Sequence, residues 1–193
     1  SKCFTEAISL FDEMMLKNVK PNTATLATVL SACSQVADLE KGEKVHHLIK
    51  NDEDIELNVS LSTALVNMYA KCGQLEKSRE IFNAMKDRDT ISWNVMIAGY
   101  AMHGDTESAI KLFKQMEQSN VVPNSVTFLH LLSACSHSGF VDEGKLLFNR
   151  MKKYSVIPTL KHYTCIVDLL GRSGNLLEAE KLVLSMPVRP DGG

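Results

Sequence analysis

Apolar residues recur along this chain at the spacing of amphipathic helices, and they do so in pairs of short stretches. In residues 90–124, Trp93 and Ile97 stand four residues apart in one stretch, and Leu112 and Met116 do so in a second. This spacing places side chains on one face of a helix. Gly104 lies between the stretches, where glycine readily ends a helix. The pattern therefore predicts a helical hairpin that cannot bury its apolar stripes alone.

The hairpin pattern repeats along the whole chain. Each second stretch begins with a small residue that is followed by apolar residues three, four and seven positions later, except that His46 stands four positions after Gly42. These small residues lie 31 to 36 positions apart, at Ala7, Gly42, Ser78, Ala109, Gly144 and Ala179. The apolar stripes predict units at 23–58, 59–89, 90–124, 125–159 and 160–191, after a lone second helix within 1–22. Repeats of this length predict an all-α fold, a solenoid of stacked antiparallel helical hairpins.

Composition narrows the function more than the fold. The chain is 45% hydrophobic and 23% charged, which is typical of a globular protein, and no apolar run reaches the roughly 18 residues of a membrane helix. The net charge of −2 provides no overall attraction for phosphates, so any nucleic-acid binding must come from a local face. Because the chain starts at Ser1 without a leader and ends in Gly192-Gly193, we expect a piece of a longer protein.

Cysteine and histidine positions argue against a metal site or a catalytic centre. The five cysteines include no Cys-x-x-Cys pair, which speaks against a disulfide framework and a zinc knuckle. His46 and His47 are adjacent, so on a helix they point about 100° apart and are expected to serve packing. No histidine begins the His-x-Glu motif of a zinc deaminase. We therefore predict that the chain is not an enzyme and has no cofactor or metal.

The repeat motifs resemble those of pentatricopeptide repeats. The unit 90–124 carries the Trp93-Asn94 start, an Ala-x-x-Leu-Phe-x-x-Met second helix and a Pro123-Asn124 close. The alternation of unit lengths resembles the plant P-L-S subfamily. This implies a partial P repeat at 1–22, an L repeat at 23–58, an S repeat at 59–89, a P repeat at 90–124, an L repeat at 125–159 and an S repeat at 160–191, wound into a right-handed superhelix. The tetratricopeptide family fits less well, because its 34-residue period is uniform.

The resemblance implies sequence-specific binding of single-stranded RNA, with one base read per repeat. In this family the fifth and the last residue of a repeat read the base edge, and the second residue packs against the base. Three complete pairs follow: Thr63 with Asp89 for G, Asn94 with Asn124 for a pyrimidine, and Thr164 with Asp191 for G. The remaining residues of this kind are Asn22, a last residue without its fifth-position partner, and the apolar second-position residues Ile91 and Val126. The long units carry Ala27 with Asn58 and Leu129 with Thr159, so direct reading is not expected there.

Two functional alternatives follow from the resemblance. The first is the specificity module of an organelle RNA-processing factor for C-to-U editing, in the chloroplast or the mitochondrion, with any deaminase domain lying beyond residue 193. The second is a scaffold that binds protein partners through the solenoid, with small editing-factor proteins at the long repeats. Neither involves a membrane or a small-molecule substrate. Taken without the repeats, Thr63, Asn94 and Thr164 are polar residues that satisfy amides near helix starts.

Overall fold

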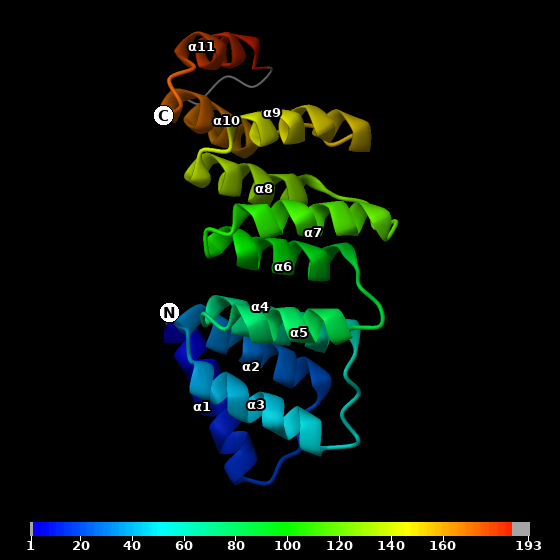
Figure 1. Cartoon of the computed structure of the whole chain (residues 1–193). Helices are drawn as coiled ribbons and strands as arrows, with labels where there is room; N and C mark the ends of the chain where they lie inside the picture. Colours follow the sequence, from blue (N-terminus) through cyan, green and yellow to red (C-terminus); the bar gives the residue numbers. More distant parts are fainter. Residues whose placement is uncertain (1, 187–193) are drawn as a thin grey trace. The chain divides into compact units, whose positions relative to one another are not determined.

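The computed structural model of this chain describes residues 2–186, which form eleven α-helices, one 3-10 helix and no strand (Figure 1). The helices are α1 (Lys2–Leu16), α2 (Thr23–Val36), α3 (Leu39–Asn51), α4 (Val59–Lys71), α5 (Leu75–Ala84), α6 (Thr90–Met102), α7 (Thr106–Gln118), α8 (Ser125–Ser138), α9 (Val141–Arg150), η1 (Met151–Tyr154), α10 (Leu160–Arg172) and α11 (Leu176–Ser185). A helix begins at the first residue of each of the five predicted units, at residues 23, 59, 90, 125 and 160.

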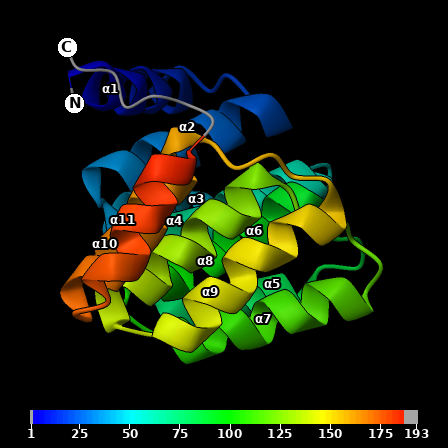
Figure 2. The ribbon, with the colours of Figure 1, turned by 90° about the horizontal axis from the view of Figure 1, so that it is seen from above.

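The helices form two compact bodies, residues 1–99 and 100–193, which we call the N-terminal half and the C-terminal half. In the N-terminal half, the first helices α2 and α4 pack on each other. Within the hairpins, α2 packs on α3 and α4 packs on α5. Between neighbouring units, α1 packs on α2 and α3 packs on α4. The C-terminal half repeats this scheme, with α8 on α10, α9 and α11 as their second helices, and α7 against α8 (Figures 1 and 2). The predicted all-α fold of stacked helical hairpins is confirmed.

The turn inside each hairpin depends on a left-handed residue after the first helix. Gly139 takes this conformation with φ of 73° after α8, and Ala37 takes it with φ of 55° at the equivalent place after α2. The left-handed conformation costs a residue with a Cβ about 1–2 kcal/mol. Asp38 then begins α3 as an N-cap, because its Oδ1 accepts the Lys41 amide at 3.0 Å. The cap satisfies one of the amides that a helix start leaves without a partner.

Each half has an apolar core between its first and second helices. In the C-terminal half, Phe113 of α7 and Phe128 of α8 meet edge to face, with ring centroids 5.7 Å apart. The edge-to-face arrangement suits the charge distribution of aromatic rings. Cys33 and Cys135 are completely buried at equivalent positions of α2 and α8, where they pack in the core. Burial raises the pKa of the Cys33 thiol to about 11 and that of Cys135 to about 12.

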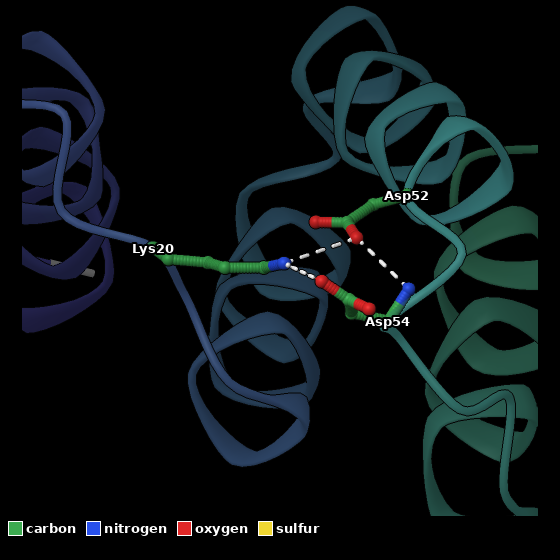
Figure 3. Close-up of polar contacts among 3 residues, drawn as sticks. All are labelled: Lys20, Asp52 and Asp54. Carbon is green, nitrogen blue, oxygen red and sulfur yellow. Dashed lines mark hydrogen bonds and ion pairs between the residues drawn. The ribbon is translucent and has the colours of Figure 1, made fainter.

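An ion-pair cluster closes the open end of the first complete hairpin (Figure 3). Lys20 lies before α2, and its Nζ is 2.7 Å from Asp54 Oδ2 and 3.2 Å from Asp52 Oδ1 in the loop after α3. The Asp54 amide also donates to Asp52 Oδ1 at 3.0 Å. The hydrogen bond from Lys20 lowers the pKa of Asp54 below its ordinary value. The cluster ties the loop of the longest unit to the segment that precedes it.

Candidate nucleic-acid interface

Thr63, the fifth residue of unit 59–89, carries a buried hydroxyl without a hydrogen-bond partner. The residue lies in the second turn of α4 and is 9% exposed. Its Oγ1 has no hydrogen-bond partner among residues 2–186. A buried hydroxyl left in this state costs about 1–3 kcal/mol. Such a residue is more often explained by function than by stability, because valine would fill the same space without the polar atom.

Asp89, the last residue of the same unit, is exposed and serves as the N-cap of α6. Its Oδ1 accepts the Ser92 amide at 2.8 Å, and its main-chain oxygen accepts the Ser92 hydroxyl at 2.8 Å. One carboxylate oxygen is therefore committed to the helix. The second, Oδ2, can accept a hydrogen bond from a ligand, and it can accept only.

The last residue also caps the following helix in other units. Asn22 Oδ1 accepts the Thr25 amide at 2.8 Å, and Asn58 Oδ1 accepts the Leu61 amide at 2.9 Å. An asparagine side chain has both an acceptor oxygen and a donor nitrogen, and here the oxygen caps the helix. Because the helix start uses Oδ1, the amide nitrogen is the remaining polar group, and it is a donor. An Asn or Asp directly before a predicted helix is the sequence signal for this role.

The second predicted pair, Asn94 and Asn124, is divided between the two halves. Asn94 lies in α6 and is 6% exposed. Asn124 caps α8, where its Oδ1 accepts the Thr127 amide at 3.1 Å and its own amide donates to the Thr127 hydroxyl at 3.0 Å. Both side chains are thus placed within their own half, and their pairing stays a prediction.

Of the third predicted pair, Thr164 with Asp191, only Thr164 lies in the part of the chain that the structure describes. Thr164 is exposed on α10, and its Oγ1 donates to the main-chain oxygen of Leu160 at 2.9 Å. The hydroxyl is thereby satisfied by its own helix, unlike that of Thr63. Asp191, the expected partner, lies outside the described residues. The two threonines that the sequence treats alike are therefore in different states.

The two apolar second-position residues lie at the surface. Ile91 in the first turn of α6 is 63% exposed, and Val126 in the first turn of α8 is 47% exposed. An exposed branched side chain gains free energy when a flat apolar surface covers it. The face of a nucleobase is such a surface, so this placement agrees with the packing role that the resemblance implies.

A polar row continues along α4 from Thr63, and sequence reasoning missed it. Asn67 and Lys71 follow at intervals of four residues, which keeps them on about the same face. The amide of Asn67 donates to the Ser34 hydroxyl of α2 at 3.2 Å, which joins neighbouring first helices. Lys71 is exposed at the end of the row. An exposed lysine about two turns along the helix from the candidate reading residue can approach a phosphate.

The equivalent row on α10 contains Asp168 and Arg172, which form an ion pair. Asp168 Oδ2 accepts the Ser136 hydroxyl of α8 at 2.5 Å, and Asp168 Oδ1 accepts Arg172 Nε at 2.9 Å. These two hydrogen bonds, that of Ser136 first, lower the pKa of Asp168 below its ordinary value. Arg172 is consequently paired with a carboxylate, whereas the row on α4 ends in a lysine.

Neither metal ligation nor membrane insertion finds support in the part of the chain that the structure describes. Residues 2–186 contain no group of three or more His, Cys, Asp and Glu side chains that could hold a metal ion. None of the helices in this range is both long and apolar enough to span a bilayer.

Profiles of known repeats match most of the chain. The PPR repeat matches residues 1–19, 61–90, 126–156 and 161–189, and the PPR repeat family matches residues 88–137. The chain belongs to the pentatricopeptide repeat family. Similar pentatricopeptide repeat-containing proteins come from Arabidopsis thaliana. One is 47% identical over 186 residues, which are 96% of this chain and 28% of the relative. Another, labelled mitochondrial, is 44% identical over 187 residues, 96% of this chain and 33% of the relative.

Solved structures of pentatricopeptide repeat proteins share the fold. Maize PPR10 superposes with a TM-score of 0.71 at 24% identity, over 96% of this chain and 27% of PPR10. PPR10 in complex with an 18-nt psaJ RNA element gives a TM-score of 0.79 at 22% identity, over 92% of this chain and 26% of PPR10. The PPR domain of Arabidopsis thaliana PRORP1 in complex with tRNA gives 0.68 at 17% identity, over 83% of this chain and 86% of that domain. The chain spans about a quarter to a third of its curated relatives.

Proposed function

We propose that this pentatricopeptide repeat chain binds single-stranded RNA along its first helices and reads one base per repeat. The observation that carries the proposal is the buried, unpartnered hydroxyl of Thr63 together with the exposed carboxylate of Asp89 in the same unit. RNA-bound structures of PPR10 and the PRORP1 domain support the choice of ligand. An unpaired hydroxyl and a carboxylate oxygen are both groups that the edge of a base can satisfy.

The chemistry of this pair favours guanine. Asp89 Oδ2 is an acceptor, and the guanine edge offers two donors, its N1–H and its amino group. Uracil offers one donor and cytosine presents an acceptor at the equivalent place, so both make fewer hydrogen bonds with a carboxylate. The Thr63 hydroxyl can donate or accept and so completes the edge.

The other pairs extend the proposed reading along the RNA. Asn94 with Asn124 is assigned to a pyrimidine and Thr164 with Asp191 to a second guanine. The intervening long unit, with Leu129 in fifth position, is assigned no preference. The RNA runs 5′ to 3′ as the protein runs from N to C, which gives guanine, pyrimidine, any base and guanine. Ile91 and Val126 pack against bases, and Asn22 contributes only where a preceding repeat supplies its fifth residue.

A Thr63→Asn substitution tests this reading. The purified chain is incubated with a random pool of single-stranded RNA, and the bound fraction is sequenced. The unaltered chain should enrich guanine and a pyrimidine at a fixed spacing. Thr63→Asn should shift the preference at one position from guanine toward uracil and leave its neighbours unchanged, because one hydrogen-bonding side chain has been exchanged for another.

The matched control is Thr28→Asn, the same substitution on an exposed face of α2. The Thr28 hydroxyl donates to the main-chain oxygen of Ala24 at 2.8 Å and is not in fifth position. It should leave every base preference unchanged. A uniform loss of affinity with Thr63→Asn, without a change of preference, would mean that Thr63 is structural. No enrichment by the unaltered chain at any salt concentration would refute RNA reading by this chain.

The wider role that we propose is the specificity module of an organelle C-to-U editing factor of the P-L-S type. Unequal units support the subfamily, since the second helix has ten residues in the short unit and thirteen in the standard one. The relative labelled mitochondrial supports an organelle, and we propose the mitochondrion or the chloroplast as the site of action. In this role the chain selects the RNA, and a deaminase elsewhere performs the chemistry.

A hollow on the second-helix side favours a protein partner as the second candidate function. It measures about 1050 Å³ and lies over α4 between α3 and α5. Its apolar lining residues are Val59, Leu57, Leu65, Tyr69, Ile81, Ala84 and Met85. Leu57 is largely exposed at its edge. Leu57→Lys should abolish binding of a purified small editing-factor protein, measured by calorimetry, and leave RNA preference unchanged.

A further inference from the structure

The short unit 59–89 ends its second helix about one turn early. Its α5 spans ten residues and stops at Ala84, after which Met85 is extended with φ of −65° and ψ of 126°. The α7 helix of the standard unit has thirteen residues. With 3.6 residues per turn, the short unit lacks most of a turn. The chain must therefore pass from the end of α5 to the N-cap of α6 within residues 85–89.

Arg88 closes this early end. Its Nε donates to the main-chain oxygen of Phe82 at 2.9 Å, and its Nη2 donates to that of Asn83 at 2.7 Å. The last carbonyl groups of a helix lack partners in the helix itself, and a cation there also interacts favourably with the helix dipole. A forked guanidinium can serve two carbonyls at once, which an ammonium group does less well.

The same guanidinium joins α5 to α6 through two aromatic rings. It lies 4.9 Å from the ring centroid of Phe82 and 5.9 Å from that of Trp93. The two rings pack edge to face with centroids 5.0 Å apart. Both rings are buried. Arg88 is thus held both by hydrogen bonds to main-chain oxygens and by contact with two aromatic rings.

Asp89 follows Arg88 directly, and hydrogen bonds from the first turn of α6 hold its main chain and its side chain. Its main-chain oxygen accepts the Trp93 amide at 3.2 Å, and its Oδ1 accepts the Ser92 amide. The direction of Oδ2 is therefore set by a short stretch of backbone with an anchor at each end. A group that reads a base must be held to within about 0.5 Å, so both anchors matter.

We propose that Arg88 is a positioning residue for base reading, which replaces the missing turn of α5 and holds Asp89 where its carboxylate can meet the RNA base. The inference rests on the proposed function, since it requires that Asp89 reads a base. The short unit 59–89 can then read a base as a standard unit does, because the Arg88 side chain makes up for the missing turn of α5.

The test compares Arg88→Lys and Arg88→Gln with the unaltered full chain. The probes are single-stranded RNAs of the enriched sequence that differ only at the base assigned to Thr63 and Asp89. We expect the preference for guanine at this position to fall on the order of tenfold, the effect of losing one hydrogen bond to a charged group. Preference at the other positions should not change. Lysine should recover part of the effect, since it retains the charge but not the fork.

Arg79→Gln is the matched control, because it removes the same charge from the neighbourhood of the same ring. The Arg79 guanidinium lies 5.6 Å from the centroid of Phe82 but is outside the connection between α5 and α6. It should weaken all RNAs equally or not at all. Amide exchange at Ser92 provides a readout without RNA, and we expect it to accelerate in the Arg88 variants alone.

The outcomes separate this inference from the proposed function. If the unaltered chain has no base preference, or Asp89→Asn leaves it unchanged, then base reading by Asp89 is wrong. If that preference depends on Asp89 but persists in both Arg88 variants, Arg88 is only a helix cap and the positioning role is refuted. If Arg88→Gln does not fold, Arg88→Lys decides the question, and an unchanged guanine preference in it overturns the inference.

Discussion

At the scale of single residues, two threonines at equivalent positions hold their hydroxyls in different ways. Thr164 donates to its own helix at Leu160, whereas the hydroxyl of Thr63 is buried without a partner. Threonine can satisfy itself on the preceding turn, so the residue type does not determine the outcome. The unsatisfied state makes Thr63 a costly residue for folding and a suitable one for binding.

Thr63→Val should therefore stabilise the protein and weaken its preference for guanine. Removing an unsatisfied buried hydroxyl while retaining the shape should raise the free energy of unfolding by about 1 kcal/mol. Thr164→Val, on an exposed site with a satisfied hydroxyl, should not stabilise. Thermal unfolding measures the first effect, and sequencing of bound RNA measures the loss of guanine preference. A lower melting temperature for Thr63→Val would mean that the Thr63 hydroxyl stabilises the folded protein.

At the scale of elements, small residues determine how closely a second helix approaches the first helix of the following unit. A Cβ at Gly144 of α9 would overlap the Leu169 Cδ2 methyl group of α10 and lie 3.4 Å from Cys135 Cβ. A Cβ at Gly42 of α3 would overlap the side-chain end of Met68 in α4. The two contacts differ, because methionine is more flexible than leucine and can make room.

Gly144→Ala should consequently destabilise the protein more than Gly42→Ala. Overpacking costs about 1–3 kcal/mol, and the higher helix propensity of alanine offsets about 1 kcal/mol of this. We expect a net loss of about 1 kcal/mol for Gly144→Ala and little change for Gly42→Ala. Urea unfolding of both variants measures the difference. Equal effects would show that Leu169 relaxes as readily as Met68.

The contact between α8 and α10 should make stability depend on pH in the acid range. The pKa of Asp168 is lowered in the folded protein by the hydrogen bonds from Ser136 and Arg172, so the carboxylate favours folding above its unfolded pKa of about 3.9. This contribution is lost as the pH falls through the lowered value. Asp168→Asn should remove it, so that the variant loses less stability than the unaltered chain on acidification below about pH 4. Parallel curves of unfolding free energy against pH would contradict the assignment.

At the scale of the whole molecule, charge limits how the chain can bind RNA. The net charge is −2. The polar row on α4 ends in Lys71, and the row on α10 ends in Arg172, which forms an ion pair with Asp168. Affinity must therefore come mainly from base contacts. Since each phosphate contact contributes about −0.7 to the slope of log affinity against log salt for single strands, one or two contacts predict a slope of about −1.

Titration of RNA at several salt concentrations measures this slope. Lys71→Gln should make it shallower by about 0.7 and weaken all RNAs alike, because a phosphate contact carries no base information. Lys44→Gln on the second helix α3 is a control of equal charge and should leave the slope unchanged. A slope steeper than about −5 would show that many more cations meet the RNA than the first helices provide.

The amino-acid sequence determined the all-α fold, the helical hairpins and the residues at which the first helices begin, because these depend on the spacing of apolar residues and on turn and capping residues a few positions away. It also singled out Thr63 and Asp89. Only the tertiary structure decided that the Thr63 hydroxyl lacks a partner, that Asp89 commits one oxygen to α6, and that Arg88 closes α5. Those properties depend on burial and on donor–acceptor geometry between helices, which residue type and spacing do not contain.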